Sequence, residues 1–155
     1  MDYALTKTVL IALETAGVRY AIFGAVALNL HGLARATEDL DVFIEANPEN
    51  IERLRVALRS VFDDPHIEEI TAEDLLGDYP AVQYIPPQGG FHIDILTRLG
   101  EVWRFGDLEV QRVELDELEV PVVTPRTLYA MKKGTVRPKD WGDAAMLRDF
   151  FDLEE

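Results

Sequence analysis

Apolar residues recur along this chain with two different periods, and the period changes from one segment to the next. In residues 3–16 and 48–62 they recur at helical spacing, which is typical of helices that pack one face on a core. Gly17 closes the first of these segments, because glycine readily ends a helix. The second begins at Asn47-Pro48, a capping residue followed by proline at the first helical position. The pattern therefore predicts a helix in each segment.

Short β-rich apolar runs, bounded by glycine, proline or polar residues, predict strands between these helices. The predicted strands are residues 18–23, 39–45, 81–85, 91–97, 108–115 and 118–123. The proline- and glycine-rich segment 86–90 predicts a hairpin loop. Further helices are predicted from Ala25 onward, after a cap at Thr71, and as a closing pair over 125–133 and 139–151. Because strands and helices are interleaved, we expect an α/β or α+β fold with a mixed sheet flanked by helices and a C-terminal helical pair.

The length and composition limit the class of protein to which the chain can belong. Its 155 residues fit one domain over 1–155, with a core at about 18–97 and further strands and helices over 108–151. An apolar content of 48% argues against disorder. The absence of cysteine excludes disulfides and thiolate chemistry, and the three histidines lack the spacing of a zinc site.

Charge and hydropathy limit the kinds of partner that the chain can bind. The chain has 29 acidic and 15 basic residues, a net charge of −14, which disfavours nonspecific nucleic-acid binding. This charge is compatible with a cationic small substrate or a basic protein partner, and it also simply favours solubility. No apolar run is long enough to span a bilayer and no signal peptide is visible, so we expect no membrane partner and a cytoplasmic location.

The first candidate for chemistry is the run from Thr37 to Ile44, which contains Asp39 and Asp41. The strand period of two places these two carboxylates side by side, on the face opposite the apolar residues. Carboxylates that close repel each other unless a cation lies between them, and a divalent ion with oxygen ligands is the usual solution. A solvated strand edge is the alternative for an isolated Asp-x-Asp.

A third carboxylate follows in the run from Phe91 to Leu96. There His92 and Asp94 share one face of the predicted strand. If this strand neighbours the first one, Asp39, Asp41 and Asp94 converge, and three unpaired carboxylates at one point favour metal binding. His92 is then a candidate wall of the site.

The Phe23-Gly24-Ala25 segment is a predicted junction of strand, turn and helix. A helix N-terminus presents free backbone N–H groups, which suit a phosphate, and Gly24 allows a ligand to approach the backbone closely. A tight turn alone explains an isolated Gly-Ala equally well. Beside the acidic strands, phosphate plus divalent metal is the more economical interpretation.

Together these motifs resemble the signature of the DNA polymerase beta-type nucleotidyltransferase superfamily. The resemblance is carried by Gly24-Ala25, by Asp39-Leu40-Asp41-Val42 at the characteristic distance, and by Ile93-Asp94-Ile95. The stretch 128–143 is similar to the closing helices of small bacterial members, which include antibiotic nucleotidyltransferases and abortive-infection-type toxins.

The resemblance implies transfer of a nucleoside monophosphate from a nucleoside triphosphate, with ATP the expected donor, to a hydroxyl. It implies that Asp39, Asp41 and Asp94 bind Mg²⁺ or Mn²⁺ and that Asp94 accepts the proton of the attacking hydroxyl. It further implies that the Gly24 and Ala25 N–H groups and Lys132 contact the triphosphate. The chain departs from the pattern at Ala25, where many catalytic members have a serine hydroxyl.

Several nearby residues allow two interpretations. Arg35 and Thr37 precede the carboxylate pair, so they are candidate nucleotide contacts, but a solvated arginine and a turn-stabilising hydroxyl fit equally. Asp140 and Asp143 lie three apart on a predicted helix, where they would hold Arg137 or Lys132 in place or cap the helix.

Two functions fit these residues. The first is a metal-dependent nucleotidyltransferase whose hydroxyl acceptor is a small molecule, a protein or an RNA end. The alternative is a catalytically weak protein of the same fold that acts as a binding or regulatory module, with a small protein partner in a toxin–antitoxin pair. Ala25 favours the alternative, whereas the presence of all three carboxylates favours the enzyme.

Overall fold

The centre of the protein is one mixed six-stranded sheet. The structure is a computed structural model that describes residues 3–37, 39–133 and 138–153. The strand order is β3-β4-β2-β1-β8-β7, with β1–β8 and β2–β4 parallel and the other neighbours antiparallel. These strands are β1 (Tyr20–Phe23), β2 (Asp39–Ile44), β3 (Ala81–Tyr84), β4 (His92–Leu96), β7 (Val110–Leu115) and β8 (Leu118–Val123).

Helices flank this sheet and confirm the predicted fold class. The described α-helices are α1 (Tyr3–Thr15), α2 (Gly24–Leu30), α3 (Pro48–Val61), α4 (Ala72–Leu76), α5 (Pro125–Lys133) and α6 (Pro138–Phe151). Two 3₁₀ turns, η1 (Pro65–Glu69) and η2 (Phe105–Asp107), and a small hairpin of β5 (Arg98–Leu99) and β6 (Trp103–Arg104) were not predicted. Strands of two residues leave no hydrophobic period to recognise.

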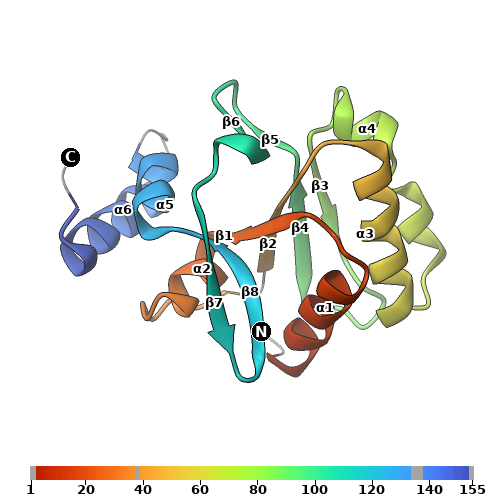
Figure 1. Cartoon of the computed structure of the whole chain (residues 1–155), viewed down its shortest axis with the longest axis horizontal. Helices are drawn as coiled ribbons and strands as arrows, with labels where there is room; N and C mark the ends of the chain where they lie inside the picture. The colour runs from red at the N-terminus through yellow and green to blue at the C-terminus, as the bar shows by residue number, and fades with distance from the viewer. Residues whose placement is uncertain (1–2, 38, 134–137, 154–155) are drawn as a thin grey trace.

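The helices lie in two groups. In Figure 1, α1, α3 and α4 lie on one side of the molecule, and the C-terminal pair α5 and α6 lies at the other. The main core contains apolar residues of α1 and α3 together with inward-facing residues of the central strands. Its most deeply buried side chains include Leu10, Leu13, Ile51, Leu54, Leu40, Val42, Ile93 and Ile95. Among the described residues, no helix has the length and apolarity that a bilayer crossing requires.

Asn50 forms buried hydrogen bonds at the edge of this core, next to the start of β1. Its side chain is almost fully buried, and Oδ1 accepts the Arg19 N–H at 2.7 Å. Its Nδ2 donates to the carbonyls of Arg19 and Glu45, each at 2.9 Å. These three bonds satisfy a buried amide and link α3 to the neighbouring ends of β1 and β2.

The strand register then places the acidic residues. In the parallel β2–β4 pair, Asp41 lies opposite Asp94 and Asp39 lies opposite His92. Leu40 and Val42 alternate with the two aspartates and are fully buried, so the aspartates project from the other face of the sheet. The condition on which the sequence argument depended, that the two acidic strands are neighbours, is met.

Candidate active site

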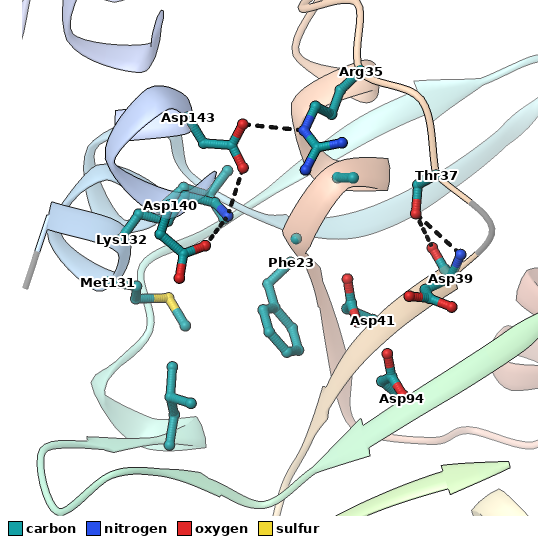
Figure 2. Close-up of a pocket in the computed structure, with 14 residues that line it drawn as sticks. Phe23, Arg35, Thr37, Asp39, Asp41, Asp94, Met131, Lys132, Asp140 and Asp143 are labelled. Carbon is teal, nitrogen blue, oxygen red and sulfur yellow. Dashed lines mark hydrogen bonds and ion pairs between the residues drawn. The ribbon is translucent and has the colours of Figure 1, made fainter. Parts of the chain in front are cut away.

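A row of side chains crosses the sheet on its carboxylate face. The register pairs Phe23 of β1 with Asp41, Asp41 with Asp94, and Asp94 with Gln83 of β3. Gln83 Nε2 donates to Asp94 Oδ1 at 3.2 Å. Figure 2 shows the Asp41 and Asp94 carboxyl groups next to each other, with the Phe23 ring beside them.

Gly24 follows Phe23 and turns the chain from β1 into α2. Its φ of +70° lies in the left-handed region, and a Cβ at this position would lie 2.0 Å from Asp41 Oδ2. Any side chain here would displace the central carboxylate, so the residue must be glycine for two independent reasons. No side chain caps the N-terminus of α2. The sequence suggested close approach of a ligand at Gly24, and the structure shows close approach of Asp41.

The environment of Asp41 disfavours a charge. Burial, a hydrogen bond to the Asp94 carboxyl and the negative charges of Asp94 and Asp39 raise the pKa of Asp41 from its ordinary value of 3.8 to about 8. Lys132 acts in the opposite direction, but more weakly. Without a cation, this carboxyl pair holds a proton near neutral pH, at the position where a cation would let both groups ionise.

Asp39 has different partners. Its Oδ1 lies 2.9 Å from His92 Nδ1, and its backbone N–H donates to the Thr37 hydroxyl at 3.0 Å. Among the described residues, no three His, Cys, Asp or Glu side chains gather closely enough to hold a metal ion as they stand. The contact with His92 explains why Asp39 does not complete such a group: the Asp39 carboxylate would have to exchange His92 for the ion. Thr37 supports the Asp39 backbone, as expected of a turn-stabilising hydroxyl.

Two cations face the carboxylates from the other end of the site. Lys132 Nζ donates to Asp140 Oδ1 at 3.3 Å and to Asp143 Oδ2 at 3.1 Å. Arg35 Nε donates to Asp143 Oδ1 at 3.1 Å. The Asp143 side chain is only 6% exposed, so it links the loop after α2 to the C-terminal helices through a buried network (Figure 2).

Most of these side chains surround one cavity of about 280 Å³, but Gln83 does not line it, and neither does His92, which the sequence suggested as a wall of the site. The cavity is lined by Phe23, Gly24, Ala25, Arg35, Thr37, Asp39, Asp41, Asp94, Leu99, Leu128, Met131, Lys132, Asp140 and Asp143. The eight candidate residues from the sequence are all in this set. Asp140 and Asp143 were assigned only a supporting role, and the apolar wall of Leu99, Leu128 and Met131 was not foreseen, because apolar residues give no signal of their own.

Other residues considered from the sequence lie outside this set. His31 Nε2 hydrogen-bonds the Val123 carbonyl at 2.8 Å, and its ring packs edge-on against Phe151, so it is a packing residue at the end of α2. Trp141 is half exposed. Arg137 lies outside the described residues, so only Lys132 of the two expected partners of Asp140 and Asp143 is seen.

The donor set fits a divalent cation and a phosphate. Asp41 and Asp94, as register partners, supply the hard oxygen ligands that Mg²⁺ and Mn²⁺ prefer, and Asp39 can join them only by exchanging its contact with His92 for the ion. Arg35 and Lys132 lie at the opposite end of the same cavity, where both are paired with Asp143 and Lys132 also with Asp140. The arrangement can bind a metal–polyphosphate complex between its two ends.

Comparison with protein families gives one match that spans most of the chain. Residues 11–155 match the family described as "Nucleotidyl transferase AbiEii toxin, Type IV TA system". Comparison with curated proteins finds no significant match.

Solved structures of the same fold are similar over 96% of this chain. A nucleotidyltransferase structure from Thermotoga maritima has a TM-score of 0.55 at 15% identity, over 91% of that chain. The enzyme ANT(2")-Ia in complex with adenylyl-2"-tobramycin has a TM-score of 0.58 at 11% identity, over 88% of its chain. The lincosamide antibiotic adenylyltransferase LnuA, bound to lincomycin, has a TM-score of 0.56 at 13% identity, over 97% of its chain. At these identities the likeness shows the nucleotidyltransferase fold.

Proposed function

Because the chain belongs to the AbiEii nucleotidyl transferase family, and is thus a nucleotidyltransferase, we propose that it moves a nucleoside monophosphate from ATP to a hydroxyl acceptor. The reaction forms a bond between the acceptor oxygen and the α-phosphorus, breaks the bond between that phosphorus and the bridging oxygen, and releases pyrophosphate.

The observation that carries this proposal is the pair of facing carboxyls at Asp41 and Asp94. They are register partners on parallel strands, and burial, together with the hydrogen bond and charge of Asp94, raises the pKa of Asp41. A protein that only needed a stable sheet would gain by replacing either residue with a neutral one. The pair therefore supports a ligand that supplies positive charge.

In this proposal Asp39, Asp41 and Asp94 hold two Mg²⁺ or Mn²⁺ ions, and Thr37 keeps the Asp39 backbone in place. When bound, the metals supply charge stabilisation for the attacking oxygen and the pyrophosphate leaving group. Asp94 accepts the proton of the attacking hydroxyl, as a carboxylate next to the site of attack can.

The remaining candidates bind the triphosphate. Lys132 and Arg35 supply its positive charge, and Asp140 and Asp143 hold these cations in the free protein. The backbone N–H groups at Gly24 and Ala25 donate to phosphate oxygens at the uncapped start of α2. Ala25 offers no hydroxyl, so this contact depends on the backbone alone.

The test is calorimetric titration of Mg²⁺ together with each nucleoside triphosphate. We expect binding by the wild type and by the control Asp63→Asn, which removes an exposed acid outside the cavity, and little binding by Asp41→Asn or Asp94→Asn. Equal metal-dependent binding by all four proteins would refute the assignment of the site.

The acceptor can be found by following the α-phosphate. Cell extract is incubated with enzyme and α-labelled ATP, and label is measured in the ribonuclease-sensitive, protease-sensitive and small-molecule fractions. We expect Asp41-dependent label in one fraction, and no Asp41-dependent label from γ-labelled ATP because the γ-phosphate leaves with pyrophosphate. Asp41-dependent label from γ-labelled ATP would indicate a different reaction.

We further propose that the enzyme is the toxic member of a toxin–antitoxin pair with a second protein, as its family description suggests. Growth arrest on expression of the wild type, absent with Asp41→Asn and relieved by the product of an adjacent reading frame, is the expected result. Equal growth arrest by the wild type and Asp41→Asn would show that the toxicity does not depend on the proposed reaction.

A further inference from the structure

The small β5–β6 hairpin has two unlike faces. Its register pairs Arg98 with Arg104 and Leu99 with Trp103, around a turn at Gly100 with φ of +60°. Because directly opposed residues project to the same side, the two arginines share one face and the two apolar residues share the other. Leu99 lines the active-site cavity, so the hairpin forms part of its wall (Figure 1 shows β5 and β6 at the edge of the molecule).

The arginine face carries two like charges without a partner. Directly opposed residues of an antiparallel pair have Cβ atoms about 4.5–5.5 Å apart, and like charges there are destabilising. Neither the Arg98 nor the Arg104 guanidinium makes an ion pair or hydrogen bond with any residue that the structure describes. Most other described basic side chains do pair with a carboxylate, for example Lys7 with Asp116 at 3.1 Å.

These two arginines also border a second cavity. It has a volume of about 540 Å³ and is lined by Pro80, Arg98, Gly100, Glu101 and Arg104. Arg98 and Gly100 flank Leu99 in the sequence, so this cavity and the active-site cavity lie on opposite sides of the same strand. In a chain of net charge −14, two guanidinium groups without a carboxylate partner beside one cavity are unusual, and Glu101 is the one acidic residue among the described ones that line the cavity with them.

We propose that Arg98 and Arg104 form a phosphate-binding site beside the active site. Two guanidinium groups on one face present several N–H donors, and this donor set matches the oxygens of a phosphate group. A bound phosphate would also remove the repulsion between the two charges. The ligand is a phosphate-bearing molecule, either a small phosphate or the backbone of a single-stranded polynucleotide. That this molecule is the acceptor rests on the proposed function, whereas the phosphate site itself does not.

The test uses the full chain with EDTA and without nucleoside triphosphate, so that it is independent of the metal site. Binding of inorganic phosphate is measured by calorimetry, and binding of a labelled single-stranded RNA of about 15 nucleotides by fluorescence anisotropy at several salt concentrations. The variant is Arg98→Gln/Arg104→Gln. The matched control, Arg53→Gln/Arg126→Gln, removes the same charge from one half-buried and one exposed position outside both cavities, as the variant does within the second cavity.

We expect the variant, but not the control, to weaken binding at least about tenfold, because charge-assisted hydrogen bonds are lost. Loss in the RNA experiment, with a slope of log K against log salt reduced by about 1.4 for two contacts, identifies a polynucleotide. Loss in the phosphate experiment alone identifies a small phosphate. No binding by the wild type, or equal loss in variant and control, overturns the site. The two proposals can fail separately. If the variant loses phosphate binding as expected, but Asp41→Asn keeps metal-dependent nucleotide binding, only the proposed function is refuted.

Discussion

Replacing Asp41 with asparagine is expected to stabilise the metal-free protein, by an amount that grows with pH. At low pH the carboxyl is protonated in both the folded and the unfolded chain, and its ionisation contributes nothing to stability. Between its ordinary pKa of 3.8 and its folded pKa of about 8, the unfolded chain has released the proton but the folded chain retains it. The free energy of unfolding therefore falls as pH rises through this window, by up to about 1.4 kcal/mol per pH unit.

The expected magnitude follows from that slope. From about pH 5 to about pH 8 the full slope would amount to about 4 kcal/mol, and we expect the wild type to lose about 2–4 kcal/mol relative to Asp41→Asn over this range. The largest cause of the raised pKa is burial, and the hydrogen bond and charge of Asp94 come next. Asp94→Asn should therefore abolish only part of the effect.

The measurement is urea unfolding with EDTA at several pH values, on wild type, Asp41→Asn and the control Asp63→Asn. The readout is the difference between the pH profiles, because other groups titrate equally in all three proteins. Saturating Mg²⁺ should remove most of the difference by replacing the proton, since a ligand of the native state stabilises it. Profiles that stay parallel within about 0.5 kcal/mol would refute the view that the Asp41 carboxyl is held protonated by its surroundings.

Three further substitutions test the neighbouring geometry. Gly24→Val should lower the melting temperature and abolish metal-dependent triphosphate binding, because its Cβ would lie 2.0 Å from Asp41 Oδ2; calorimetry showing wild-type affinity would contradict this. Ala25→Ser should keep or tighten triphosphate binding by about 0.5–1.5 kcal/mol, one hydrogen bond, and clearly weaker binding in the same titration would place the phosphates elsewhere. Asp143→Asn should lose about 1.5–3 kcal/mol of unfolding free energy in urea because Arg35 loses its carboxylate partner and Lys132 keeps only Asp140, whereas a loss no larger than that of the exposed control Asp149→Asn would show that the network is weak.

Much of the fold could be predicted because its elements carry strong local signals. Asn47-Pro48 marks the start of α3 to the residue, and the Asn47 side chain accepts from the Asn50 N–H as a cap should. The alternation in β2 predicted which face Asp41 occupies. The order of strands in the sheet could not be predicted, because a period of two fixes a face but not a neighbour.

The candidate site was predicted less completely. The carboxylates and Gly24 were found because their residue types are unusual at those spacings. The contact of Asp39 with His92 and the link from Arg35 to Asp143 depend on tertiary distances that the sequence does not encode locally. The same is true of Arg98 and Arg104, which face each other only because a two-residue hairpin turns between them.

The parallel register of β2 and β4 has a consequence for how such a protein can change over evolutionary time. Asp41 and Asp94 meet because two strands are aligned, and the exposed loop 87–90 that precedes β4 takes no part in that pairing. Insertions of varied length in the exposed loop 87–90 should therefore leave the chemistry intact. A single residue inserted within β4 would instead turn Asp94 into the core and bring Ile93 to the surface in its place. Lineages of this enzyme should consequently differ freely in the length of that loop, while tolerating no change of length inside the two acidic strands.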